Sequence, residues 1–282
     1  MKRILLLAIA LLGSALATSA QVNYKFKTID VPGSNFNRPH NINRHGDIVG
    51  LFSFRTGGGH GYLSHNGEFQ QIDFPGATFT SARGINSSMQ IVGGYVDSND
   101  VDHAFLLENG LLTSFDFPGA ISTDAYDIND AAEIVGVYID TVGVSHGFSL
   151  KNGTFHTLDL PHTLSSGNGG LNNAGVIAGG ATKANNAQVG FLWFDGKFKT
   201  FSFPGADSTS MQDLNDSGEA CGFYTDAVGT THGFTLTIFG FRALEVPNSA
   251  VTLPLGINKS GRIVGEYIDA GGVAHGFLAI PR

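Results

Sequence analysis

Short apolar runs separated by turn-forming residues recur along the chain at a constant spacing. In one stretch the strand-like runs are residues 81–85, 91–96, 103–107 and 112–117. Between the last two runs stands Asn109-Gly110, a strong hairpin signal, because both residue types accept the positive φ of a two-residue turn. No helical periodicity of useful length follows the N-terminal segment. The pattern therefore predicts an all-β chain.

The four-strand unit is repeated six times, with a period of 43 residues and no insertion or deletion. The proline of an Asp-Phe-Pro-Gly-like motif marks each copy: Pro32, Pro75, Pro118, Pro161, Pro204 and Pro247. An asparagine keeps the same step: Asn43, Asn86, Asn129, Asn172, Asn215 and Asn258. Four short strands in roughly 40–45 residues are typical of a propeller blade. The sequence therefore predicts a six-bladed β-propeller over residues 21–282.

The phase of the repeat predicts how the ring closes. The first strand-like run after the N-terminal segment, residues 26–31, has the character of a fourth strand. The last run, residues 275–280, has that of a third strand. We expect these two runs to pair in one blade, which removes both exposed sheet edges. An open β-solenoid is the alternative. In a solenoid the first and last runs would not pair with each other, and its terminal repeats would need atypical caps.

The N-terminus has the pattern of a secretory signal peptide over residues 1–20. Lys2 and Arg3 precede an apolar stretch, residues 4–12, and small residues follow; we expect cleavage after Ala20. An uncleaved anchor is the alternative, although the apolar stretch is shorter than the roughly 20 residues of a membrane span. We therefore expect a secreted or periplasmic protein without a transmembrane anchor.

Charge and cysteine content narrow the possible partners. The formal net charge is −8, and it becomes −10 if Lys2 and Arg3 leave with the leader. Because phosphate neutralisation dominates nucleic-acid affinity, an acidic chain without a basic cluster argues against nucleic acid as a partner.

The single cysteine, Cys221, excludes an intramolecular disulfide, and valine or alanine replaces it in the other repeats. We expect Cys221 and Trp193, which aligns with leucines, to be packing residues in a monomer.

A motif in the third strand resembles the repeat of a bacterial extracellular family. His103-Ala104-Phe105 reads His-Ala-Phe, and glycine replaces the alanine in His146-Gly147-Phe148, His232-Gly233-Phe234 and His275-Gly276-Phe277. Gly-Ile-Asn and Ile-Val-Gly runs surround these motifs. From residue 26 to the C-terminus the chain thus resembles the HAF-repeat family. The resemblance implies export and an all-β repeat fold, and it implies no catalytic residue.

An aspartate and a histidine recur six residues apart around the loop between the second and third strands. The pairs are Asp97 and His103, Asp140 and His146, Asp226 and His232, and Asp269 and His275. In the fourth repeat Lys183 and Val189 replace both partners together, which indicates that the two side chains act as a pair. We interpret the pairs as structural clamps that satisfy polar groups of the loop. A metal site or general base is the alternative, but one pair supplies only two of the three or four ligands that zinc needs.

The acidic run over residues 97–102 is similar to a calcium-binding loop. Its fifth position is Val101, however, and the glycine that such a loop requires is missing. We therefore disfavour calcium and expect no cofactor.

Positions that differ between repeats are the best candidates for ligand binding, because the repeated positions form the scaffold. Three residues before the repeated asparagine stand His40, Arg83, Tyr126, Gly169, Gln212 and Leu255. Two residues earlier stand Arg38, Ser81, Asp124, Gly167, Ser210 and Leu253. We expect both sets in the loop that runs into the first strand, around one mouth of the channel. The predicted ligand contacts are His40, Arg83, Tyr126, Gln212 and Asp124; ordinary surface variation is the alternative.

The fourth repeat departs most from the pattern. It has Pro161-His162 where most repeats have Pro-Gly, a glycine-rich run over residues 165–170, and Ala181 where the others carry an aromatic residue. Either this copy has drifted, or its glycine-rich segment forms an open loop that makes room for a ligand.

Three functions fit these features. The first is an exported, non-enzymatic module that binds a glycan or another surface polymer at the channel mouth. The second is a propeller hydrolase or lyase with His40 or Asp124 as general acid or base and Arg83 steadying an anionic group; strong pKa shifts in a closed pocket would favour it. The third is a structural or adhesive surface protein, which a blocked mouth would favour. The fold alone cannot decide between them.

Overall fold

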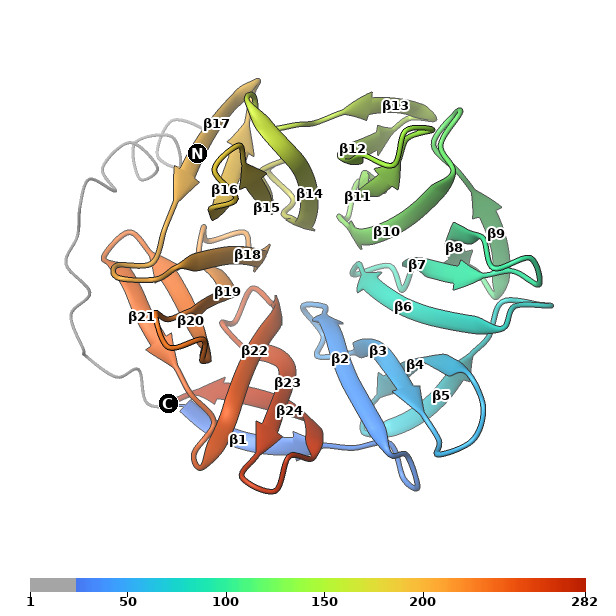
Figure 1. Ribbon diagram of the computed structural model, residues 1–282. Coiled ribbons are helices and arrows are strands. Elements are labelled where there is room, and N and C mark those ends of the chain that lie inside the picture. Colours follow the sequence, from blue (N-terminus) through green and yellow to red (C-terminus); the bar gives the residue numbers. More distant parts are fainter. Residues whose placement is uncertain (1–23) are drawn as a thin grey trace.

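Residues 24–282 of the computed structural model form six four-stranded blades around a central channel (Figure 1). All elements of this described part of the chain are strands. The predicted six-bladed β-propeller is therefore confirmed. The predicted signal peptide lies outside the described residues, and none of the described residues forms a helix that could span a membrane.

Each blade runs from an innermost strand at the channel to an outermost strand at the rim. The innermost strands are β2 (Phe36–Ile42), β6 (Phe79–Ile85), β10 (Ser122–Ile128), β14 (Thr163–Leu171), β18 (Ser208–Leu214) and β22 (Ser249–Ile257). The second strands are β3 (Ile48–Ser53), β7 (Ile91–Val96), β11 (Ile134–Ile139), β15 (Ile177–Lys183), β19 (Ala220–Thr225) and β23 (Ile263–Asp269).

The outer half of each blade follows the same order. The third strands are β4 (Gly59–His65), β8 (Asp102–Glu108), β12 (Ser145–Lys151), β16 (Gln188–Phe194), β20 (Thr231–Thr237) and β24 (Ala274–Pro281). The outermost strands are β5 (Glu68–Ile72), β9 (Leu111–Phe115), β13 (Thr154–Thr157), β17 (Lys197–Phe201), β21 (Gly240–Leu244) and β1 (Tyr24–Ile29).

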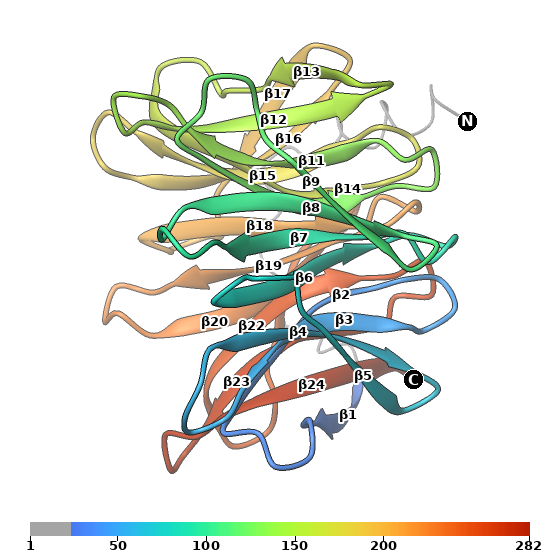
Figure 2. The ribbon, with the colours of Figure 1, turned by 90° about the vertical axis from the view of Figure 1, so that its right-hand side faces the viewer.

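The ring closes as the phase of the repeat predicted. Strand β1 pairs with β24 in antiparallel register, with Tyr24 opposite Pro281 and Ile29 opposite Gly276. Figure 2 shows β1 beside β24 in the ring seen edge-on. The sixth blade is thus built from both ends of the described chain, and its outer edge is the N-terminal strand.

The repeated glycine of the second strand is explained by close backbone approach. A Cβ added at Gly93 would lie 1.9 Å from the carbonyl oxygen of Ser81 on the innermost strand and 3.0 Å from the ring of Phe105. That ring belongs to the third-strand aromatic set, which is fully buried in every blade: Tyr62, Phe105, Phe148, Phe191, Phe234 and Phe277. Glycine is therefore required wherever this ring fills the blade.

Cys221 is fully buried, as the sequence predicts. It packs with Leu244, Val246 and Phe277 at the interface of the last two blades. Trp193 is only partly buried, and it packs against two hydrophobic clusters of the fourth blade, one of which includes Val135 of the third blade.

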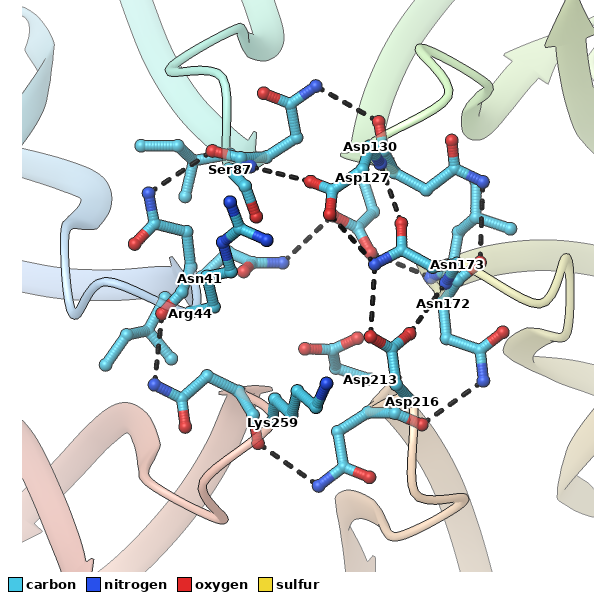
Figure 3. A pocket seen from close by; sticks show the side chains of 18 of the residues that line it. Asn41, Arg44, Ser87, Asp127, Asp130, Asn172, Asn173, Asp213, Asp216 and Lys259 are labelled. Atoms are coloured by element: carbon cyan, nitrogen blue, oxygen red, sulfur yellow. Dashed lines mark hydrogen bonds between the residues drawn. The ribbon is translucent and has the colours of Figure 1, made fainter.

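The six repeated asparagines form a closed ring at one end of the channel (Figure 3). Each side-chain Nδ2 donates to the main-chain carbonyl of the next asparagine, from Asn43 to Asn86 at 3.2 Å and finally from Asn258 back to Asn43 at 3.0 Å. The intervening links measure 3.0, 3.4, 3.2 and 3.1 Å. Each Oδ1 also accepts main-chain N–H groups of its own turn. This end is called the asparagine pole below.

Candidate functional site

A β-bulge in every innermost strand positions the variable residues. The pairing with the second strand skips one residue in each blade, for example between Ala82 and Gly84 and between Ala125 and Asp127. The skipped residues are His40, Arg83, Tyr126, Gly169, Gln212 and Leu255. Bulges re-aim a side chain out of the regular alternation of a strand. The prediction of a loop is wrong for these residues, although the strand-like run predicted over residues 81–85 already included Arg83. All six lie within the strands, and the bulges set their direction.

Four of the five predicted ligand contacts line one cavity of about 200 Å³ in the channel, to which all six blades contribute residues. They are His40, Arg83, Tyr126 and Gln212. The fifth, Asp124, is not among the lining residues. Arg38, Asn41, Gly169, Phe223, Leu253 and Leu255 complete the lining. This cavity is called the mouth.

Arg83 is held rigidly at the mouth. Its Nε donates to Asp124 Oδ1 at 3.0 Å, and its Nη2 lies 2.7 Å from Asp124 Oδ2. The guanidinium also lies 4.6 Å from the ring centroid of Tyr126, a cation–π contact. A two-point contact with a carboxylate fixes the plane of an arginine. Asp124 therefore positions Arg83 and leaves its remaining N–H groups as fixed donors.

His40 is a fixed hydrogen-bond acceptor. Its Nδ1 lies 2.9 Å from the carbonyl oxygen of Ala82, which can only accept, so Nδ1 carries the hydrogen and Nε2 is free of one. Burial, reinforced by the nearby charges of Arg83 and Arg38, lowers the pKa of His40 to about 3. The imidazole is thus neutral at any ordinary pH.

The charges at the mouth are neutralised in pairs between neighbouring blades. Arg38 donates through Nε to Glu266, which is buried. Burial raises the pKa of Asp124, although the adjacent Arg83 opposes this. The fifth and sixth blades add the apolar side chains of Phe223, Leu253 and Leu255 to the lining. The mouth therefore combines fixed polar groups with apolar side chains.

A second cavity, of about 300 Å³, adjoins the mouth. It lies between the third, fourth and fifth blades and shares Tyr126, Gly169 and Gln212 with the mouth. The glycine-rich run of the fourth repeat lines it. An open loop was one of the two interpretations of this run, the other being drift. The run belongs instead to strand β14, so it forms no open loop. This second cavity is called the alcove.

The predicted Asp–His pairs contain a second acidic partner that the spacing did not reveal. His146 Nδ1 donates to Asp159 at 2.6 Å, and its Nε2 lies 3.3 Å from Asp140. Burial lowers the pKa of His146, but the hydrogen bonds to both carboxylates outweigh it and raise the pKa overall. Three other histidines are bracketed in the same way: His103 by Asp97 and Asp116, His232 by Asp226 and Glu245, and His275 by Asp269 and Asp30.

The second acid precedes the proline of the repeated motif. One signal in the sequence could have revealed it, because the fourth blade has Ser202 at this position as well as Lys183 and Val189 at the other two. All three members of the clamp are therefore lost together. An aromatic ring covers the histidine in these blades, as Tyr138 does for His146 at a centroid distance of 4.9 Å.

The acidic loop that begins at Asp97 is closed by its own hydrogen bonds. Asp97 Oδ1 accepts the main-chain N–H groups of Asn99 and Val101, at 2.8 and 3.0 Å, and these bonds lower the pKa of Asp97. Its Oδ2 faces Asn99 and His103. Within residues 24–282 no group of three or more His, Cys, Asp or Glu side chains is placed to hold a metal ion.

Two buried carboxylates near the asparagine pole were not singled out from the sequence. Asp127 and Asp213 lie on the third and fifth blades, and Asn41 donates to Asp127 at 3.1 Å (Figure 3). Each aspartate also accepts the N–H of the following residue and an N–H of the next blade, those of Leu171 and Ile257. Burial raises the pKa of Asp127 to about 7, and burial together with Asp127 raises the pKa of Asp213 well above its usual range.

Comparisons with known proteins show the fold. The Aleuria aurantia lectin, in a mutant form in complex with Fucα1-6GlcNAc, superposes with a TM-score of 0.54 at 9% identity, over 90% of this chain and 98% of the lectin. A luciferin-regenerating enzyme gives 0.54 at 10% identity, over 92% and 95%. TolB from Acinetobacter baumannii gives 0.56 at 10% identity, over 78% and 59%. No family model and no curated protein sequence matches this chain.

Proposed function

We propose that this chain is an exported, non-enzymatic module that binds a glycan at the mouth of the propeller channel. The observation that carries the proposal is the mixed lining of the mouth, in which fixed donors and acceptors stand beside apolar side chains. Leu253 and Leu255 belong to the sixth blade, next to the first blade, which carries His40. Sugar rings have the same mixed character, since they present hydroxyl groups at the edge and C–H groups on the faces.

Rigidity at the mouth supports a binding role. The side chains of His40, Arg83 and Gln212 each keep a hydrogen bond within the protein, to Ala82, Asp124 and Ser210 respectively. Their remaining polar atoms are thus oriented before any ligand arrives. Pre-organised groups lose little conformational entropy on binding.

The likeness to lectins is consistent with this proposal. The Aleuria aurantia lectin is a six-bladed propeller described as fucose-specific. At 9–10% identity this likeness concerns the fold, and a luciferin-regenerating enzyme shares it too. The chemistry of the mouth therefore carries the proposal. Membership of the HAF-repeat family, export to the periplasm or medium, a monomeric state and the absence of a required cofactor belong to the same proposal.

The test is a glycan array probed with the wild type and two variants. Arg83→Ala and Tyr126→Ala remove the fixed donor and the ring beneath it, and binding should be abolished in both. Arg44→Ala is the matched control, since Arg44 is exposed at the asparagine pole. If both variants melt at the temperature of the wild type and still bind glycans as the wild type does, the mouth is not the binding site.

A hydrolase or lyase is the second candidate, because the pKa of His40 is shifted as strongly as expected for an enzyme. The direction of the shift argues against acid–base chemistry, since an imidazole with a pKa of about 3 is neutral near neutral pH, so it lacks the acidic proton of the imidazolium and is a weak base. Asp124 is committed to Arg83. Release of shortened products from the glycans that bind, abolished by His40→Gln, would establish the enzyme instead.

A purely structural or adhesive role is the third candidate, and a blocked mouth would have favoured it. The mouth is instead hollow, with a volume of about 200 Å³. If no glycan in the array binds, a structural or adhesive role becomes the best-supported function.

A further inference from the structure

The fourth blade lacks side chains that the other blades place beside the channel. Gly167 and Gly169 occupy the two variable positions of its innermost strand, where most repeats carry larger residues. Ala181 stands where the other five repeats have phenylalanine or tyrosine. On the neighbouring second strand, a Cβ added at Gly180 would meet only Ser210 Oγ at 3.2 Å and a carbonyl oxygen at 3.9 Å. At Gly169 the main chain of Gln212 occupies the place of a side chain, 2.5 Å from an added Cβ. Gly167, Gly180 and Ala181 together open the alcove.

A comparison with the second blade shows that a glycine alone does not open such a space. Gly94 is the counterpart of Gly180, but a Cβ at Gly94 would lie 2.4 Å from Asp124 Oδ1, so the carboxylate of the adjacent blade fills that position. Beside Gly180 the corresponding residue is Ser210, which is much shorter. The alcove therefore results from several small residues meeting at one seam.

The lining of the alcove is neutral and rich in hydroxyl and amide groups. Among the described residues, those that line it include no Asp, Glu, Lys, Arg or His. The polar groups come from Ser145, Ser165, Thr182, Gln188, Ser210 and Gln212. Val137 and Met211 supply apolar contact surface. Such a lining suits an uncharged ligand with several hydroxyl groups, and it offers no cation for a carboxylate or phosphate.

The alcove borders the mouth. Tyr126, Gly169 and Gln212 line both cavities. The combined volume falls in the range of a site for a ligand larger than one small ring.

We propose that the alcove is a second subsite, which holds a neutral sugar ring adjacent in the glycan to the ring at the mouth. This inference rests on the proposed function and makes it more specific: the preferred ligand is an uncharged oligosaccharide of at least two rings. One ring contacts Arg83 and His40, and its neighbour enters the fourth blade between Ser145 and Ser210.

The test fills the alcove with residues that other repeats already carry. Gly167→Ser introduces the residue of the second and fifth repeats, and a Cβ there meets only Val137 Cγ2 at 3.3 Å. Ala181→Tyr introduces the aromatic residue of four other repeats. Ala184→Tyr, at an exposed position on the same blade, is the matched control. Thermal melting shows whether each variant keeps the fold.

The probes are neutral hexose and deoxyhexose oligosaccharides of one to four rings, with hexuronic-acid oligosaccharides of the same lengths. For the wild type and Ala184→Tyr we expect affinity to rise about tenfold from one neutral ring to two. Gly167→Ser and Ala181→Tyr should abolish this step and leave the one-ring affinity unchanged. If the gain in affinity from one ring to two persists in both folded variants, or if hexuronic acids are preferred, the alcove is not the second subsite, and the assignment of the mouth is unaffected. If the wild type binds no probe, or if one-ring binding survives Arg83→Ala, the assignments of the mouth and of the alcove are both wrong.

Discussion

Asn258 in the last blade donates a side-chain hydrogen bond to the main-chain carbonyl of Asn43 in the first blade, at a distance of 3.0 Å. These residues are 215 positions apart in the chain. Their contact completes a ring of six equivalent bonds, so the asparagine pole is closed by side chains as well as by the pairing of β1 with β24.

Replacement of Asn258 by aspartate should destabilise the protein. The introduced carboxylate would keep oxygens for the N–H groups of Ser260 and Arg262, but it would place an oxygen against the carbonyl of Asn43, which would keep only the N–H of Gly46 as a donor. Loss of one hydrogen bond costs about 0.5–1.5 kcal/mol, and the contact between two oxygens adds to this loss. Urea unfolding should show a lower midpoint with an unchanged slope. Ser260→Ala, which removes only a neighbouring hydroxyl, is the control, and equal stability of the two variants would contradict the role of the ring.

The buried pair Asp127 and Asp213 should make stability fall as pH rises. A carboxyl group whose pKa is higher in the folded than in the unfolded state stabilises fully below its unfolded pKa, and this contribution is lost as pH rises through the folded pKa. For Asp127 that window runs from about pH 4 to about pH 7. Asp213→Asn removes one of the two charges.

The measurement is the free energy of unfolding of both proteins at intervals from about pH 4 to about pH 8. Asp213→Asn loses one acceptor for a main-chain N–H, so it should be less stable than the wild type at the acidic end of this range. That deficit should shrink as pH rises. A constant difference across the range would show that the two carboxyl groups do not repel each other.

Two adjacent glycines of β15 should respond differently to alanine. A Cβ at Gly179 would lie 2.2 Å from the carbonyl oxygen of Gly167 and 2.6 Å from the ring of Phe191, whereas at Gly180 the nearest atom is Ser210 Oγ at 3.2 Å. Overpacking a core costs about 1–3 kcal/mol or more. Gly179→Ala should therefore lose about 3 kcal/mol or fail to fold, and Gly180→Ala less than about 1 kcal/mol. Thermal melting of the pair tests this, and equal losses would refute it.

The clamp of His275, which links strand β24 to Asp30 just after strand β1, should stabilise the protein mainly at low pH. The hydrogen bond from His275 to Asp30 raises the pKa of His275, and Asp269 adds to this. The contribution of a group with a raised pKa is complete below about pH 6.5 and is lost as pH rises further. Both partners are partly exposed, so the effect is below about 1 kcal/mol.

Asp30→Asn tests this contribution. It should lower stability at about pH 5.5 and change it little at about pH 8.5, measured by urea unfolding. Asp73→Asn, the same change at the pair of His60 and Asp73 in the first blade, where Phe54 replaces the other aspartate, is the comparison. Because Asp73 does not join the two ends of the chain, we expect a smaller loss there. A loss from Asp30→Asn that does not depend on pH would exclude protonation of His275 as its cause.

The sequence by itself determined the ring. Six uninterrupted copies of a 43-residue unit predicted six equivalent blades, and the phase of the repeat predicted that the N-terminal strand joins the last blade. Gly93 and Phe105 could be assigned to the scaffold because a residue repeated in every copy must satisfy the same packing in every copy. Local patterns sufficed here because each blade repeats the same contacts with its neighbours.

Only the tertiary structure decided which of the unlike residues meet. The bulges that aim His40 and Arg83 into the channel are set by register with the second strand, which the pattern of a single strand does not reveal. The carboxylates of Asp127 and Asp213 come together from different blades across the channel axis. The alcove arises because small residues of the fourth blade face Ser210 of the fifth. Each of these features depends on distances across the ring, and those are fixed only when the ring is closed.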